Sequence, residues 1–326
     1  MTPKKWRNEI EKHISRWESR LANRRWWPRF VYFYTDISNI PNILREGRLY
    51  SRTVALQKGI VNRDCACQNI ITNTNPEHIR YVRLYFRPRT PTQYRNEGIR
   101  PKAEVWNDAH CPVPVFLLFD ALSTLSHDNA EFSNISLASP YAKHGSTLND
   151  FHDIDFDKVF HEGRYDPDTD GDISKHRHAE VLIPQHLEIH PHLRYIACRS
   201  QAERDTLIYL LEQLDEIQIL QYWQQRIRIG NSRMFEKRWA FVNTVDTNGS
   251  ELRINFNRST QHVTLFNGQL TLQLDDSQPY VFNQQIPANN TLIYIIDGSH
   301  NTLFLEILLD DCLAYRNIIS LNDIIL

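Results

Sequence analysis

The sequence contains little glycine, few cysteines and no long hydrophobic run. Ten glycines in 326 residues argue against an enzyme built around a glycine-rich nucleotide-binding loop. The five scattered cysteines are odd in number and include no second pair at zinc-ribbon spacing, which excludes a disulfide framework and fits a reducing compartment. No apolar run reaches the ~18–20 residues that cross a bilayer, so we expect a cytoplasmic protein without a membrane partner.

Aromatic residues are abundant, and charge is unevenly distributed. The chain is 41% hydrophobic with 7 Trp, 14 Tyr and 15 Phe, which excludes general disorder. Although the net charge is −2, residues 1–100 hold 20 Lys and Arg against 8 acidic residues, a balance of +12, so the rest carries −14. An anionic partner such as a nucleic acid explains this asymmetry, and a solvated basic surface explains it equally well.

Hydrophobic periodicity divides the chain into three parts. Residues 1–27 form a basic amphipathic helix that ends before Pro28. Residues 28–225 alternate strands and helices, which predicts an α+β domain with a mixed central sheet. Strands are expected at 30–35, 81–86, 113–119, 179–184 and 193–198. Loops are expected at 57–78, 128–153 and 166–178. Residues 231–326 contain short strands between Asn-Gly, Asp-Gly and Asn-Asn turns, which predicts an antiparallel β domain of unassigned role.

Four segments, in the same order along the chain, resemble the DarT family of NAD-dependent nucleic-acid ADP-ribosyltransferase toxins. Residues 32–44 (YFYTDISNIPNIL), followed by Gly47, are similar to the family's Tyr-His-x-Thr-x-x-x-Asn-Leu segment. Residues 81–94 (YVRLYFRPRTPTQY) are similar to its Tyr-Val-Pro-Phe-Tyr-Phe-x-Pro-Arg-Ser-Pro segment. The apolar strand that ends at Asp120 and residues 178–184 (HAEVLIP) complete the match. The resemblance implies an ADP-ribosyltransferase-like fold.

The resemblance also implies catalytic residues. Glu180 matches the family's catalytic glutamate, which acts close to the reacting ribose as a base or as a ribose anchor; without the resemblance, a solvent-facing charge at the start of a strand is the simpler interpretation. The family has a catalytic arginine upstream of the second segment. Arg63 is the best candidate by spacing, and Arg52 and Arg80 are alternatives.

Five residues match positions that hold NAD in the family. They are Tyr32, Phe33, Thr35, Asn39 and Arg89. Thr35 and Asn39 are also consistent with a plain strand end and helix cap, and Arg89 with an arginine that locks a loop between two prolines. Phe33 stands where the family usually has His, so the resemblance implies that one hydrogen bond to the cofactor ribose is missing.

Nucleic-acid contacts are predicted in two places, just before the transferase domain and in the segment that leads to Glu180. Arg24 and Arg25, at the end of the basic helix, combine charge with neighbouring tryptophans, as single-strand binding requires. His176 and His178 lie in the polar segment that precedes the Glu180 strand. That segment begins with the acidic run 166–172, which resembles a calcium loop but has Arg177 at the position where the bidentate glutamate belongs. We therefore expect no metal site.

Together these features predict a toxin that transfers ADP-ribose from NAD to thymine or guanine in single-stranded DNA and releases nicotinamide. An unpaired strand fits this chemistry, because a base edge inside a duplex is inaccessible without flipping. RNA or protein acceptors, and a binding module that has lost catalysis, are the alternatives. A cognate antitoxin such as an ADP-ribosylglycohydrolase is the expected protein partner.

Overall fold

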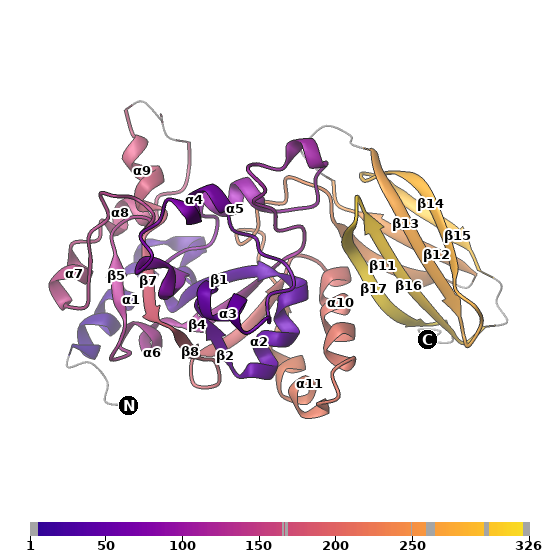
Figure 1. Ribbon diagram of the computed structural model, residues 1–326, viewed down its shortest axis with the longest axis horizontal. Helices are drawn as coiled ribbons and strands as arrows, with labels where there is room; N and C mark the ends of the chain where they lie inside the picture. The colour runs from indigo at the N-terminus through magenta and orange to yellow at the C-terminus, as the bar shows by residue number, and fades with distance from the viewer. Residues whose placement is uncertain are drawn as a thin grey trace.

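The chain is built on one large mixed sheet and two smaller antiparallel sheets (Figure 1). The computed structural model describes residues 6–164, 166, 169–248, 250–258, 265–296 and 300–321. The large sheet has the strand order β10-β9-β4-β1-β3-β7-β5-β6. Only β10 and β9 pair in parallel within it. The predicted α+β class with a mixed core sheet is confirmed.

The strands of the large sheet all lie between residues 30 and 229. They are β1 (Phe30–Asp36), β3 (Tyr81–Tyr85), β4 (Pro114–Asp120), β5 (Glu131–Ser133), β6 (His144–Gly145), β7 (Glu180–Pro184), β9 (Leu193–Cys198) and β10 (Ile227–Ile229). A separate pair consists of β2 (Arg48–Tyr50) and β8 (His186–Glu188). Because β10 pairs with β9, the large sheet extends past residue 225, the predicted end of the transferase domain.

Helices cover both faces and the ends of this sheet. They are α1 (Arg7–Arg20), α2 (Ile40–Glu46), α3 (Arg52–Gln57), α4 (Gln68–Thr72), α5 (Pro91–Asn96), α6 (Ala121–Leu125), α7 (Leu148–His152), α8 (Phe156–Val159), α9 (Gly171–His176), α10 (Gln201–Glu212) and α11 (Ile217–Trp223). The predicted N-terminal helix is shorter than residues 1–27, because 3₁₀ turns at Ala22–Arg24 and Trp27–Arg29 follow α1. The apolar stripe of α1 buries Ile10 and Trp17 in the core.

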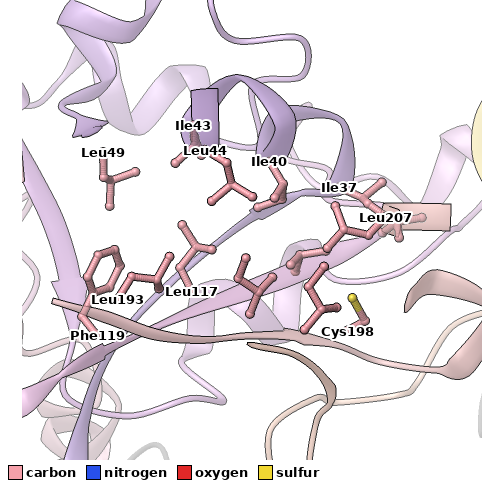
Figure 2. Close-up of a cluster of buried hydrophobic side chains, with 14 of the residues drawn as sticks. Ile37, Ile40, Ile43, Leu44, Leu49, Leu117, Phe119, Leu193, Cys198 and Leu207 are labelled. Atoms are coloured by element: carbon pink, nitrogen blue, oxygen red, sulfur yellow. The ribbon is translucent and has the colours of Figure 1, made fainter. Parts of the chain in front are cut away.

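Part of the main hydrophobic core lies between α2 and the centre of the sheet (Figure 2). Ile40 and Leu44 of α2 lie across from Leu117 of β4 in this cluster. Helix α2 ends at Gly47, whose φ of 63° places it in the left-handed region where glycine carries no Cβ penalty. The core therefore fixes α2 and the preceding turn on one face of the sheet.

The C-terminal part packs against α10 (Figure 1). Its two sheets have the orders β11-β12-β15 and β14-β13-β16-β17. The strands are β11 (Val242–Asn248), β12 (Glu251–Phe256), β13 (Leu265–Leu274), β14 (Tyr280–Pro287), β15 (Thr291–Ile295), β16 (Thr302–Leu309) and β17 (Cys312–Ser320). Thr206 of α10 accepts a hydrogen bond from the Arg316 amide of β17 at 3.0 Å, which ties the C-terminal part to this helix.

Several predicted boundaries are wrong, and tertiary pairing is the reason. The segments predicted as loops contain α4, β5, β6, α7 and α9. β5 is three residues long and pairs with β7 on one side and β6 on the other. Its own sequence therefore gives little indication of a strand. Asn267 and Gly268, an Asn-Gly pair predicted to form a turn, lie inside β13. Residues 259–264 lie outside the described residues.

Gly268→Ala tests the close approach that puts glycine inside β13. A Cβ at this position would come within 2.2 Å of the Ile286 Cδ1 atom of β14, so the substitution should lower the free energy of unfolding by ~1–3 kcal/mol. Urea denaturation followed by fluorescence measures the change. Gly171→Ala is the control, because a Cβ there meets no atom within 4 Å. A Gly268→Ala protein as stable as the wild type would contradict the described packing. The loss caused by Gly268→Ala should be smaller in an Ile286→Val background, because that substitution removes the Cδ1 methyl group.

Candidate active site

One face of the large sheet gathers polar and aromatic side chains from β1, β3 and β7. Tyr85 of β3 lies opposite Glu180 of β7 in the strand register. Because side chains alternate between the two faces of a strand, Arg83 and Tyr85 lie on the same face as Glu180. Tyr34 of β1 joins them, with its ring stacked on that of Tyr85 at a centroid distance of 6.5 Å.

The carboxylate of Glu180 is fully buried and held by three donors. Arg83 donates from Nε to Oε1 at 2.9 Å and from Nη2 to Oε2 at 2.8 Å. The backbone N–H of Leu137 donates to Oε2 at 2.9 Å. Bidentate arginine–carboxylate pairs are among the strongest and most directional hydrogen-bonded pairs in proteins. The structure therefore fixes the orientation of Glu180 and does not expose it to solvent as a plain surface charge.

This ion pair controls the electrostatics of the sheet face. Burial alone would lower the pKa of the Arg83 guanidinium, but the Glu180 carboxylate reverses that effect and raises it. Burial, reinforced by the same carboxylate, raises the pKa of the Tyr85 phenol to about 12. Arg83 is thus charged and Tyr85 is protonated at neutral pH. The arrangement offers a carboxylate, a cation and neutral hydroxyl groups side by side.

A second set of hydrogen bonds runs along the edge of this face through His178. Its Nδ1 lies 3.0 Å from the Ser174 carbonyl and its Nε2 lies 3.1 Å from the Thr92 hydroxyl. The carbonyl can only accept, so Nδ1 carries the proton and Nε2 accepts from Thr92. Burial lowers the pKa of His178 to about 4. The predicted nucleic-acid contact of His178 has no free ring nitrogen in this arrangement.

The predicted NAD residues on β1 divide between the two faces of the sheet. Tyr32 points to the same side as Tyr34, but it is completely buried and donates to the Trp27 carbonyl. Phe33 points to the opposite side, where its ring packs against the main core. Thr35 shares that opposite side by strand alternation. The structure therefore does not bring Phe33 or Thr35 together with Glu180.

Asn39 is fully engaged within the protein. Its Nδ2 donates to the Thr35 hydroxyl at 2.8 Å and to the Arg63 carbonyl at 2.7 Å, and its Oδ1 accepts from the amides of Asn62 and Arg63. Asn39 thus holds the loop that carries Arg63 against the end of β1. This finding supports a structural role for Asn39 and leaves its predicted NAD contact without a free group.

The structure pairs Glu180 with Arg83 and not with Arg63, the predicted catalytic arginine. Arg63 lines a pocket of about 220 Å³ together with Asp36 of β1 and Leu308 and Asp311 of the C-terminal part. Of its predicted competitors, Arg52 pairs with Asp64, and Arg80 lies exposed in the turn before β3. Strand register brings Arg83 to Glu180, which the spacing between motifs does not reveal. The catalytic role of Arg63 stays a prediction.

The other predicted contacts occupy partly exposed positions. Arg89 donates to Glu162 and Glu236 at 3.1 Å each, and Arg24 donates to the Phe160 carbonyl at 2.6 Å and contacts Glu162. Arg25 is exposed. His176 ends α9, and burial lowers its pKa. Their roles in NAD or nucleic-acid binding stay predictions.

Neither a metal cluster nor a membrane span is present in the described part of the chain. Within it, no three His, Cys, Asp or Glu side chains are placed to hold a metal ion. Among the same residues, no helix has the length and hydropathy needed to cross a bilayer.

Comparison with known proteins identifies the family. A family model described as "ssDNA thymidine ADP-ribosyltransferase, DarT" matches residues 32–226, more than half of the chain. The chain belongs to the DarT family. Two solved structures of DarT from Thermus sp. 2.9 are similar to it. The complex with ADP-ribosylated ssDNA is 20% identical, with 64% of this chain and 97% of that chain covered and a TM-score of 0.49. The complex with NAD+ is 19% identical, with 64% and 98% covered and a TM-score of 0.47. No curated protein matches.

Membership of the DarT family confirms the predicted activity. The protein is an NAD-dependent ADP-ribosyltransferase that acts on single-stranded DNA, with NAD as its co-substrate. The family match begins at Tyr32 and ends at Arg226, so α1 and the C-terminal sheets lie outside it. The residue roles within this DarT-family domain stay predictions.

The sequence analysis gives no role to Arg83, Tyr85 or Thr92, which the structure places beside Glu180 or His178. Arg83 stands where the quoted family segment has Pro, so the resemblance gave it no role. A usable signal is present in the alternation of Tyr81, Arg83 and Tyr85 along one strand. Once β3 is paired with the Glu180 strand, that alternation puts all three on one face.

Acidification tests the neutral state of His178. Its pKa is lower in the folded chain, about 4, than the ordinary ~6.5 of the unfolded chain. The unfolded chain therefore takes up the proton first as the pH falls, so the contribution of this group to stability is complete above about pH 6.5 and is lost between about 6.5 and 4.

The His178→Gln protein should lose about 1–2 kcal/mol less stability than the wild type between pH 7 and pH 4.5. Urea denaturation at both pH values measures the difference. His190→Gln, at an exposed position, is the control and should behave as the wild type does. Equal acid sensitivity of the His178→Gln and wild-type proteins would contradict the assignment.

Proposed function

We propose that this chain transfers ADP-ribose from NAD to thymidine in single-stranded DNA, with Glu180 as the catalytic carboxylate and Arg83 as the residue that positions it. The observation that supports this proposal is the buried, bidentate Arg83–Glu180 pair beside the Tyr34–Tyr85 rings. The family description, which names thymidine, favours thymine over guanine. An RNA acceptor is the alternative, and an antitoxin such as an ADP-ribosylglycohydrolase stays a prediction of the family resemblance.

The chemistry requires a carboxylate close to the reacting ribose. The bond between ribose C1′ and the nicotinamide nitrogen breaks, and its electron pair leaves with nicotinamide. A bond then forms between C1′ and the thymine, which loses a proton. Glu180 can hold a ribose hydroxyl or accept that proton. Tyr34 and Tyr85 supply aromatic faces, and Thr92 supplies a hydroxyl group. We call the face formed by these side chains with Arg83 and Glu180 the active-site wall, and its polar and aromatic groups fit a nicotinamide riboside better than an apolar ligand.

Access to Glu180 depends on the groups that cover it. The carboxylate has no solvent exposure, whereas the side chain of Arg83 is 21% exposed. Three donors occupy three of its roughly four lone-pair positions. Substrate binding therefore has to shift Arg83 or the turn that carries Leu137, and Arg83 is the group that an entering substrate meets first.

Mass analysis of single-stranded oligonucleotides after incubation with NAD tests the proposed acceptor. DNA that contains thymidine should gain the mass of one ADP-ribosyl group, whereas DNA without thymidine should not. Modification of guanosine alone, or of RNA alone, would contradict the proposed acceptor while leaving the transferase activity in place.

Glu180→Gln should reduce the transfer rate at least 100-fold, because the amide can neither accept the proton nor stabilise positive charge at C1′. The substitution also leaves Arg83 without its counter-charge, so thermal melting must show that the protein is folded. Glu180→Asp keeps the charge and should retain more activity than Glu180→Gln. Glu188→Gln, on β8, is the matched control, and full activity in a folded Glu180→Gln protein would disprove the assignment.

Arg83→Lys tests positioning separately from charge. Lysine keeps the positive charge but loses the two-pronged contact, so kcat should fall about tenfold or more with a smaller change in KM for NAD. A purely structural role predicts a lower melting temperature with kcat unchanged once the folded fraction is accounted for, and that result would refute the positioning role.

A further inference from the structure

Two free cysteines from separate parts of the sequence are in contact. Cys65 lies in the loop that carries Arg63, and Cys111 lies just before β4. Their thiol groups are hydrogen-bonded to each other, and neither cysteine forms a disulfide. Two thiols in contact are the arrangement from which a disulfide forms with the least movement of the backbone.

One residue, Asn96, connects both cysteines to the active-site wall. Its carbonyl accepts from the Cys111 amide at 2.8 Å. Its side chain donates from Nδ2 to the Cys65 carbonyl at 3.2 Å and accepts at Oδ1 from the Tyr34 hydroxyl at 3.1 Å. Asn96 is itself buried. A movement of either cysteine therefore reaches Tyr34, a member of the wall, through a single side chain.

The two cysteines have different surroundings. Cys65 is half-buried, so a small oxidant from solvent can reach its sulfur. Cys111 has no exposed surface, and its amide and carbonyl are both hydrogen-bonded, to Asn96 and to Gly98. Burial raises the pKa of the Cys111 thiol well above its ordinary value, and the adjacent Cys65 raises it further. Because the thiolate is the form that reacts, Cys65 is the cysteine that an oxidant meets and attacks first.

We propose that Cys65 and Cys111 form a redox modification site, at which a peroxide joins the two thiols in a disulfide that slows ADP-ribose transfer. The site fits a reducing compartment, where cysteines stay reduced until an oxidant is present. Formation of the disulfide is independent of the proposed function, whereas its effect on the transfer rate rests on that function.

The oxidation takes place in two steps. The Cys65 sulfur attacks hydrogen peroxide, so that an S–O bond forms, the O–O bond breaks and water leaves, which gives a sulfenic acid. The Cys111 sulfur then displaces the hydroxyl group, which leaves with the Cys111 proton as a second water while the S–S bond forms. The two thiols together lose two electrons, and the peroxide is reduced to two molecules of water.

The disulfide has to move the loop of Cys65. An S–S bond of about 2.05 Å is shorter than any non-bonded contact between two sulfur atoms, and Cys111 is held in place by its backbone hydrogen bonds. The loop is held by Asn39 at the carbonyl and amide of Arg63, and by Asn96 at the carbonyl of Cys65. Pulling Cys65 towards Cys111 therefore displaces Arg63, the predicted catalytic arginine, and strains the link to the wall.

Peptide mapping of the full chain tests the disulfide without any turnover. The protein is treated with hydrogen peroxide, remaining thiols are blocked with N-ethylmaleimide, and the digest is analysed by mass spectrometry. The peptides of Cys65 and Cys111 should be joined, and dithiothreitol should separate them. Cys65→Ser and Cys111→Ala should each abolish the joined peptides.

Cys67→Ser is the matched control for the disulfide. Cys67 lies in the same loop and is buried, and its substitution should leave the joined peptides in place. Melting temperatures establish that each variant is folded. A wild-type protein in which Cys65 is joined to Cys67, or in which Cys65 is oxidised without a partner, would overturn the proposal.

The effect on transfer is measured on each protein before oxidation, after oxidation and after dithiothreitol. The wild-type rate from NAD to a single-stranded thymidine oligonucleotide should fall at least about tenfold, because a small misplacement near the reacting centre is costly, and should return on reduction. The Cys65→Ser protein should keep its own starting rate throughout. A joined wild-type protein with an unchanged rate would overturn the inhibition. If thymidine is not the acceptor, the proposed function fails while the peptide map still decides whether the disulfide forms.

Discussion

Burial of the Glu180 carboxylate is the constraint on which the active-site wall depends. A charge without solvent contact is stable inside a protein only when it is paired and hydrogen-bonded. Arg83 supplies the charge, and the Leu137 amide supplies a further hydrogen bond. The same carboxylate raises the pKa of Arg83 against the effect of burial, and it adds to the effect of burial in raising the pKa of Tyr85.

Buried charges also connect the large sheet to the C-terminal part. Glu97, after α5, accepts hydrogen bonds from the Gln93 side chain and from the backbone amides of Glu236 and Lys237. Arg199 lies 3.8 Å from the same carboxylate and pairs with Glu203 of α10. The segment between β10 and β11 is therefore held at defined positions, and its Arg233 pairs with Glu162.

Local sequence was sufficient where an element carries its own signal. The predicted bounds of β1, β4 and β7 agree with the structure within about two residues, because each is a short apolar run with clear ends. β5 and α9 were missed because short polar segments have no strong preference of their own. Asn267 and Gly268 predicted a turn, but Ile286 of the neighbouring strand occupies the space that a side chain would need.

The sequence by itself determined the family, the class of fold and Glu180 as the leading catalytic candidate, because the order of the motifs and the identity of their residues can be read along the chain without knowing how it folds. Only the tertiary structure decided the partner of that glutamate. Arg83 is distant from Glu180 along the chain, and strand register brings the two together. The same physics separated Phe33 from the site, since successive side chains of a strand point to opposite faces.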